Sequence, residues 1–306
     1  MNTRYPNHPH SGYLIIRNLR VENANTISGP LTYGFPALSG FVGAVHALSR
    51  SLASRANFSH LRLDGVLIAC RDIQVQRYRE NRYSNYTFTQ TRNPILKDGS
   101  TAPIIESGRC HLTVHLAVKL YGDLHDADIA PLEQFIAEKI QQQRLAGGSV
   151  VGIDPKKPVI YCDTDSIDEH KKDLLPAFIL MSAHQDLADI TAELQQQNPS
   201  QTALDALIET AVIHQIPDEN GQWHNESIKK NRGWLVPIPI GYQGISPIIG
   251  AGELNNSRNP EYPAQYVETI YSLGRWVFPN RIENLRSAFW QQNYDAAQNL
   301  YTIQQP

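Results

Sequence analysis

The stretch Asn23–Arg50, NANTISGPLTYGFPALSGFVGAVHALSR, joins a polar loop to an apolar helical pattern. The loop combines small amide and hydroxyl side chains with turn-forming residues, namely Asn23, Asn25, Thr26, Ser28, Gly29, Pro30, Gly34 and Pro36. After Pro36, apolar side chains recur at the spacing of one buried helix face, at Leu38, Phe41, Val42, Val45 and Leu48. The sequence therefore predicts a loop that leads into a helix.

A glycine-rich loop before a helix presents backbone N–H groups and the positive end of the helix dipole. Arg50 and Arg55 follow on the predicted helix. This combination predicts an anion site and makes phosphate the natural ligand. The alternative is an ordinary connection whose glycines only shape turns.

Composition sets wide limits on the protein class. The 306 residues are 41% hydrophobic and 19% charged, as in ordinary globular proteins, and the formal net charge is −3. That small charge does not exclude nucleic acid, because binding depends on where the charges cluster. The cysteines Cys70, Cys110 and Cys162 are far apart, which is typical of free thiols in a reducing compartment. With no apolar run long enough to span a bilayer, we expect a cytoplasmic protein that does not contact membranes.

Outward from the opening stretch, the pattern alternates between strands and helices. The predicted elements are the strand Tyr13–Val21, the helix ending near Arg55, the strands Leu61–Val75 and Cys110–Tyr121, the helix Ile129–Arg144 and a strand from Val150. This βαββαβ order predicts an α+β fold with a ferredoxin-like core. The Gly147-Gly148 turn before the last strand is expected to place a second glycine loop close to the first.

Cationic and aromatic side chains alternate between residues 71 and 97. The cations are Arg71, Arg77, Arg79, Arg82, Arg92 and Lys97, against only Asp72 and Glu80. Tyr78, Tyr83, Tyr86 and Phe88 lie among them. Guanidinium groups pair with phosphates and aromatic rings stack on bases, so this segment predicts RNA contact. A solvated β-hairpin is the alternative.

The remaining chain suggests helices followed by strands. Leu174–Gln195 and Thr202–His214 have helical composition. Gly233–Ile240 contains two prolines, which confine it to a sheet edge or a semi-extended buried segment. Arg258, Arg275 and Arg281 form a second basic set together with Trp276.

Several long blocks resemble one family. They are Asn23–Leu48, TRNPILKDGSTAPIIESGRCHL (Thr91–Leu112), RLAGGSVV (Arg144–Val151), GWLVPIPIGYQGISP (Gly233–Pro247) and Gly252–Ile282. In these blocks the chain resembles the Csy-type, 5′-handle-capping subunits of type I-F CRISPR surveillance complexes. These subunits are of the Cas-five type and belong to the RAMP superfamily.

The resemblance implies a fold and a division of the chain. It implies an RRM-like (RAMP) core over residues 13–160, with a protruding β-hairpin thumb within about 76–109. A helical insertion is expected at 161–225 and a β-rich segment that packs on the core at 226–306.

The resemblance also implies binding partners. These are the 5′ handle of the crRNA, the large subunit, the first backbone subunit next to the thumb, and double-stranded target DNA only indirectly. With the residue patterns above, the expected RNA-binding residues are Asn23, Asn25, Ser28, Arg50, Arg77, Arg79, Arg82, Arg92, Arg109, Gly147, Gly148, Arg258 and Arg275.

No sequence motif for catalysis is present. The chain has no Walker loop, HExxH, GxSxG or paired-carboxylate pattern. We therefore expect a protein that is not an enzyme and needs neither cofactor nor metal. The alternative is a metal-independent endoribonuclease that processes crRNA, as some RAMP relatives do, with His46 as its general base.

Overall fold

The structure is a computed structural model that describes residues 8–306, and it divides into two compact units. The first comprises the described residues through Leu180 together with Val277–Phe289, and the second comprises Met181–Trp276 with Trp290–Pro306. The predicted boundaries near residues 160 and 225 do not coincide with the ends of these units. As domain boundaries they stay predictions.

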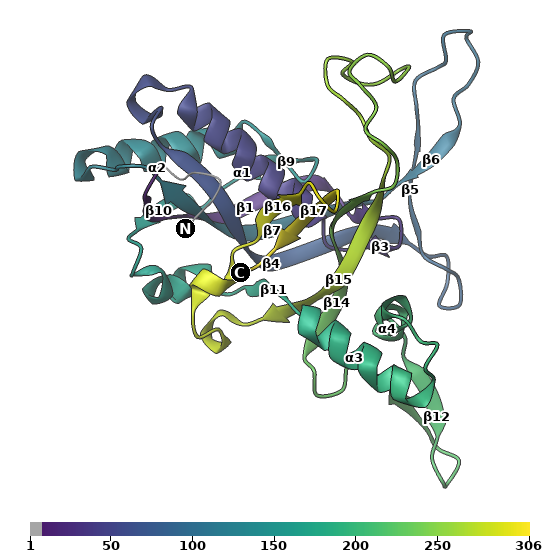
Figure 1. The fold of residues 1–306 in the computed structure, drawn as a ribbon. Coiled ribbons are helices and arrows are strands. Elements are labelled where there is room, and N and C mark those ends of the chain that lie inside the picture. The colour runs from purple at the N-terminus through teal and green to yellow at the C-terminus, as the bar shows by residue number, and fades with distance from the viewer. Residues whose placement is uncertain (1–7) are drawn as a thin grey trace. The chain divides into compact units, whose positions relative to one another are not determined.

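The first unit is a mixed α+β structure built on an antiparallel sheet (Figure 1). Its strands are β1 (His10–Asn25), β2 (Ile27–Gly29), β3 (Thr32–Tyr33), β4 (Arg62–Tyr78), β5 (Thr87–Arg92), β6 (Ile104–Ser107), β7 (Arg109–Tyr121), β8 (Arg144–Leu145), β9 (Gly148–Gly152), β10 (Val159–Cys162) and β11 (Phe178–Ser182). Its helices are α1 (Leu38–Ala53) and α2 (Asp126–Gln141), with 3-10 turns at Ala56–Phe58, Ile167–Leu174, Pro279–Arg281 and Leu285–Ala288.

The strand order across the sheet is β11-β4-β7-β1-β9-β8, and β10 pairs with the other end of β1. Helix α1 follows β1 and packs on β4, whereas α2 follows β7 and packs on β9 and β10. Apolar residues such as Phe41, Leu48 and Ile136 fill the space between helices and sheet. The predicted order of these strands and helices is confirmed.

The predicted proximity of the two glycine loops is also confirmed. The Asn25 N–H donates to the Ala146 carbonyl over 2.9 Å, and Glu22 pairs with Ser149 across β1 and β9. A Cβ on Gly148 would lie 2.6 Å from both the Ala24 nitrogen and the Glu22 carbonyl oxygen. Only glycine therefore allows the β8–β9 turn to approach the end of β1 this closely.

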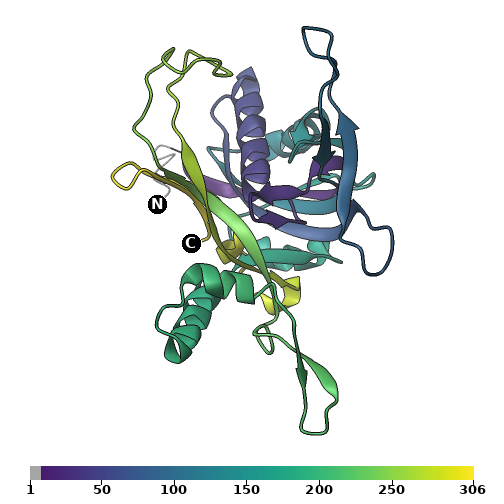
Figure 2. The same ribbon diagram turned by 90° about the vertical axis from the view of Figure 1, so that its right-hand side faces the viewer.

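The segment between β4 and β7 forms a protruding hairpin, which we call the thumb (residues 76–109; Figure 2). Strand β4 pairs with β7 as far as Gln76 opposite Arg109 and then continues beside β5. Strand β5 pairs in turn with β6. The loops 79–86 and 93–103 lie at opposite ends of β5 and point in opposite directions (Figure 1).

The second unit has an antiparallel sheet in the order β16-β17-β14-β15. Its elements are α3 (His184–Gln197), α4 (Ala203–Glu209), β12 (His214–Pro217), β13 (Trp223–Glu226), β14 (Trp234–Gly244), β15 (Val267–Val277), β16 (Gln291–Asp295) and β17 (Leu300–Gln304). Leu187, Ile190, Leu207, Leu235 and Leu273 belong to one buried cluster that joins the helices to β14 and β15.

Two predictions for this region need comment. Leu174–Gln195 is not one helix, because Phe178–Ser182 forms strand β11 and pairs with β4. Ala177, Ile179 and Leu180 are buried in this segment before α3 begins, whereas Phe178 is exposed. The edge prediction for Gly233–Ile240 is confirmed locally, because β17 pairs with β14 only from Gly241 onward and Pro237 and Pro239 precede that point.

The close approach at Gly148 gives a stability prediction. We expect Gly148→Ala to lower the free energy of unfolding by about 1–3 kcal/mol, because its Cβ meets backbone atoms that cannot move independently. The matched control is Gly43→Ala on α1, whose Cβ meets nothing within 4 Å. That change should raise helix stability by about 0.5–1 kcal/mol. Urea unfolding measures the free energy of unfolding of both variants. An equal change in the two variants would contradict the close packing at Gly148.

Candidate nucleic-acid interface

One end of the first unit's sheet gathers polar side chains around Asn23. The backbone of Asn23 has a φ of 56°, and this residue is exposed where β1 ends. Its side-chain oxygen accepts a hydrogen bond from Gln76 Nε2 over 3.0 Å, and its carbonyl accepts one from Arg109 over 3.4 Å. Gln76 also contacts His111 Nε2 at 2.9 Å. We call Asn23, Gln76, Arg109 and His111 the Asn23 cluster.

The glycine turn borders this cluster. Gly147 has a φ of 81° and is exposed, with the Asn25 Cβ 3.8 Å from where its own Cβ would lie. The Arg144 guanidinium donates to the Gly147 carbonyl over 3.3 Å. The structure thus brings Asn23, Asn25, Arg109 and the two glycines together, although they come from three separate parts of the sequence.

The base of the thumb is linked to the loop after β1. Arg77 donates to the Tyr33 hydroxyl over 3.3 Å, and the Tyr33 ring lies edge-on to Phe88 with 5.2 Å between ring centroids. In the adjoining β2–β3 hairpin, the Ser28 and Thr32 hydroxyls are 2.8 Å apart. Ser28 is therefore half-buried within a small hairpin rather than directed freely to solvent.

Arginines and tyrosines pair within the thumb. The guanidinium carbons of Arg77 and Arg79 lie 4.1 and 4.8 Å from the centroid of Tyr86, and that of Arg82 lies 5.9 Å from Tyr83. The contact between Arg77 and Tyr86 joins the loop 79–86 to β4, and the other two contacts lie within this loop. Tyr83 remains 90% exposed, so its ring is accessible for stacking.

Other predicted site residues lie elsewhere. Arg92 is at the far end of β5, about 17 Å along the strand from Thr87. Arg50 is exposed near the end of α1, about 15 Å along the helix from Gly40, whose Cβ would meet Ala146. The structure does not bring Arg50 to the Asn23 cluster.

Two predicted residues belong to the second unit. Arg258 is exposed in the segment between β14 and β15. Arg275 forms an ion pair with Asp186 at the start of α3, and its Nε is buried without a hydrogen-bond partner among the described residues. This ion pair gives Arg275 a structural partner that the sequence pattern did not indicate.

Sequence reasoning missed a second polar group on the face of the first unit's sheet opposite to α1. Asn18 accepts a hydrogen bond from Arg71 over 3.0 Å and donates one to Asp154 over 2.9 Å. Arg17 completes this group, 3.9 Å from Asp154. The available signal was the polar alternation of Asn18, Arg20 and Glu22 along β1.

Burial controls the charge of His115 beneath this group. His115 is 1% exposed, and the Asn18 N–H donates to its Nδ1 over 3.4 Å. Desolvation is the largest cause that lowers the pKa of His115 to about 4; the nearby cations Arg17 and Arg71 act in the same direction, and Asp154 and Asp173 oppose them. His115 is therefore a neutral part of the sheet interior at pH 7.

Comparison with known proteins assigns the family. Residues 14–303 match the model of the family described as CRISPR-associated protein (Cas_Csy2). The chain belongs to the Csy2 family. It is also 34% identical to the CRISPR-associated protein Csy2 of Pseudomonas aeruginosa (strain UCBPP-PA14), over 96% of this chain and 95% of that protein. The predicted resemblance to the Csy proteins of type I-F CRISPR systems is confirmed at the level of the family.

The described residues show two absences that bear on a Csy2-family site. None of the helices described is long and apolar enough to cross a membrane. Within residues 8–306, no group of three or more His, Cys, Asp or Glu side chains is arranged to hold a metal ion.

His115 gives a pH prediction. Its folded-state pKa is depressed, so the unfolded chain binds a proton near pH 6.5 that the folded chain binds only near pH 4. The free energy of unfolding should therefore fall as the pH falls through this interval, by up to about 1.4 kcal/mol per pH unit.

The variant His115→Gln should show a shallower fall between pH 6.5 and pH 4.5, measured by urea unfolding. His10, whose pKa burial also lowers, is present in both proteins and cancels in the comparison. The control is His125→Gln at an exposed position before α2. If the His115 variant kept the wild-type slope, the assigned protonation state would be wrong.

Proposed function

We propose that this chain is a non-catalytic subunit of a type I-F CRISPR RNA-guided surveillance complex and binds the 5′ handle of the crRNA. The observation that carries this proposal is the Asn23 cluster beside the Gly147-Gly148 turn in a chain of the Csy2 family. Amides and a guanidinium lie there beside a close backbone approach at which Gly147 is exposed. Such groups bind the phosphates and base edges of single-stranded RNA.

The strand order supports the finer fold assignment within this proposal. The order β4-β7-β1-β9, with α1 after β1 and α2 after β7, is the antiparallel arrangement of a ferredoxin-like unit. We therefore propose an RRM-like core of the RAMP type. RRM-like sheets present an open face and its edges to single-stranded RNA.

The thumb supports the proposed partners. Its cations and exposed tyrosines suit RNA, while exposed apolar side chains suit a protein contact with the first backbone subunit. These apolar side chains are Ile95, Leu96, Ile104 and Ile105. We also propose that this chain pairs with the large subunit of the complex and that it acts in the cytoplasm. Target DNA would then be read by base pairing with the guide, so this chain needs no sequence-specific DNA contacts.

Charge removal in the thumb tests RNA binding. We expect Arg79→Gln/Arg82→Gln to weaken binding of handle RNA about a hundredfold, because two guanidinium–phosphate contacts are lost. The slope of log affinity against log salt should fall by about 1.4. Fluorescence anisotropy with labelled handle RNA at several salt concentrations measures both quantities.

The matched control is Lys139→Gln/Lys172→Gln, which removes the same charge outside the proposed interface. It should leave the affinity close to that of the wild-type chain. Equal losses in the two double variants would mean that only net charge matters, and the proposed interface would be rejected.

The second candidate function is a metal-independent endoribonuclease. His46 is exposed on α1, so a general base at that position would be accessible to RNA. Incubation of a precursor crRNA with the purified chain tests this directly. Under our proposal the RNA stays intact, whereas shortening at one position that stops in His46→Ala would establish the nuclease.

A further inference from the structure

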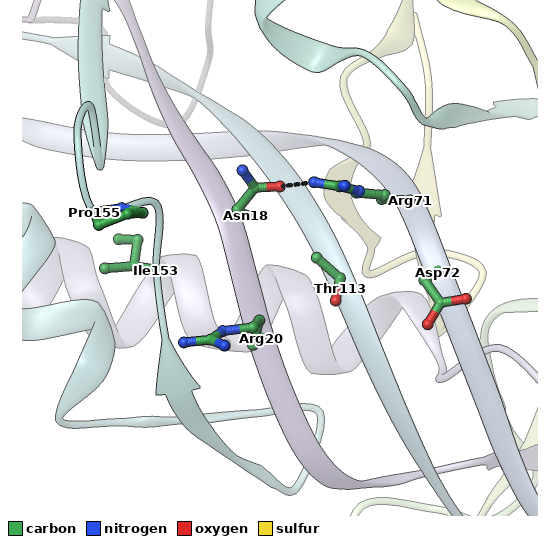
Figure 3. Close-up of a pocket in the computed structure, with 7 residues that line it drawn as sticks. All are labelled: Asn18, Arg20, Arg71, Asp72, Thr113, Ile153 and Pro155. Atoms are coloured by element: carbon green, nitrogen blue, oxygen red, sulfur yellow. Dashed lines mark hydrogen bonds between the residues drawn. The ribbon is translucent and has the colours of Figure 1, made fainter.

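A polar pocket of about 600 Å³ lies on the face of the first unit's sheet that α1 does not cover (Figure 3). Strands β1, β4 and β7 each contribute to it, and the chain after β9 closes one side. Its lining residues are Asn18, Arg20, Arg71, Asp72, Thr113, Ile153 and Pro155. Helix α1 lies behind the strands in this view, so the pocket faces away from that helix (Figure 3).

The two guanidinium groups of this pocket are held differently. Arg71 donates to the Asn18 side chain over 3.0 Å, which fixes its direction along the sheet. Arg20 lies flat against Gly152, because a Cβ there would be only 2.3 to 2.8 Å from its guanidinium atoms. Among the described residues Arg20 has no ion pair, so its charge is available to a ligand.

Among the described residues, neither of the two nearest carboxylates, Asp154 and Asp72, forms an ion pair with Arg20 or Arg71. Asp154 accepts from the backbone N–H groups of Lys156 and Lys157 at 3.0 and 2.9 Å and from the Asn18 amide. These hydrogen bonds lower the pKa of Asp154 to about 2, and the one from the Lys157 N–H contributes most. Asp72 is exposed and lies on the side of Thr113 opposite to Arg20 (Figure 3).

We propose that this pocket holds one nucleotide of single-stranded RNA, with its phosphate on Arg20 and Arg71 and its ribose 2′-hydroxyl donating to Asp72. The inference rests on the proposed function, since it names a second contact of the same RNA beyond the Asn23 cluster. Guanidinium groups match phosphate oxygens, and a carboxylate accepts a hydroxyl donor.

The position of the pocket favours a polymer over a free anion. Arg20 precedes Asn23 by three residues, about 10 Å along β1, and Thr113 and His111 are two residues apart on β7. A single strand that follows β1 therefore meets both the pocket and the Asn23 cluster. A bare phosphate would gain nothing from Asp72, whereas ribose gives this carboxylate a hydrogen-bond donor.

The experiment measures binding of fluorescein-labelled handle RNA, and of DNA with the same sequence, to the full chain. Arg20→Gln and Arg71→Gln should each weaken RNA binding about tenfold and lower the salt slope by about 0.7. Gly152→Ala should weaken it as well, because its Cβ displaces the Arg20 guanidinium without removing any charge. Asp72→Asn should reduce the preference for RNA over DNA.

Lys139→Gln on α2 serves as the control for charge, and circular dichroism melting confirms that each variant is folded. If thumb variants weaken RNA binding but Arg20→Gln, Arg71→Gln and Gly152→Ala do not, the pocket assignment is overturned and the proposed function stands. If Asp72→Asn tightens RNA and DNA equally, the ribose contact is overturned. If the wild-type chain binds no handle RNA, the proposed function itself fails together with the pocket.

Discussion

The close backbone contact between the end of β1 and the β8–β9 turn is the constraint on which the first unit depends. Gly148 lets the turn approach Ala24 and Glu22 at distances that any side chain would block. On the other side of the turn, Gly40 at the start of α1 leaves room for Ala146. Because these glycines have no side chains, β1, the β8–β9 turn and α1 pack closely together. This packing fixes the positions of the polar groups at the end of the sheet.

The two faces of the first unit's sheet carry different kinds of side chain. Helices α1 and α2 bury apolar side chains on one face, where a charge would be costly. The other face carries Arg20, Arg71 and the Asn23 cluster near the thumb. Because these side chains stand on paired strands rather than on long loops, they are held in place before any ligand binds. Preorganisation of this kind reduces the ordering cost of binding.

Much of this arrangement could be predicted from the sequence, and the exceptions have physical reasons. The β-rich composition of β1, the alternation along β7 and the helical spacing of α1 are local signals, so those elements were predicted correctly. Strand β11 was missed because Phe178–Ser182 is stabilised by pairing with β4, a contact that no local pattern reveals. Likewise, Arg275 belongs to an ion pair with Asp186, 89 residues away, and its sequence neighbours indicate only a basic surface. Arg20 was overlooked because its availability depends on Gly152.

The most direct test of the account is photo-crosslinking of handle RNA that carries 4-thiouridine, followed by mass spectrometry of the full chain. The account predicts crosslinks within residues 18–25, 77–92 and 109–113, which place RNA along β1, the thumb and β7. Crosslinks confined to the solvent faces of α1 and α2 would contradict it, because RNA would then lie on the helix-covered side of the sheet.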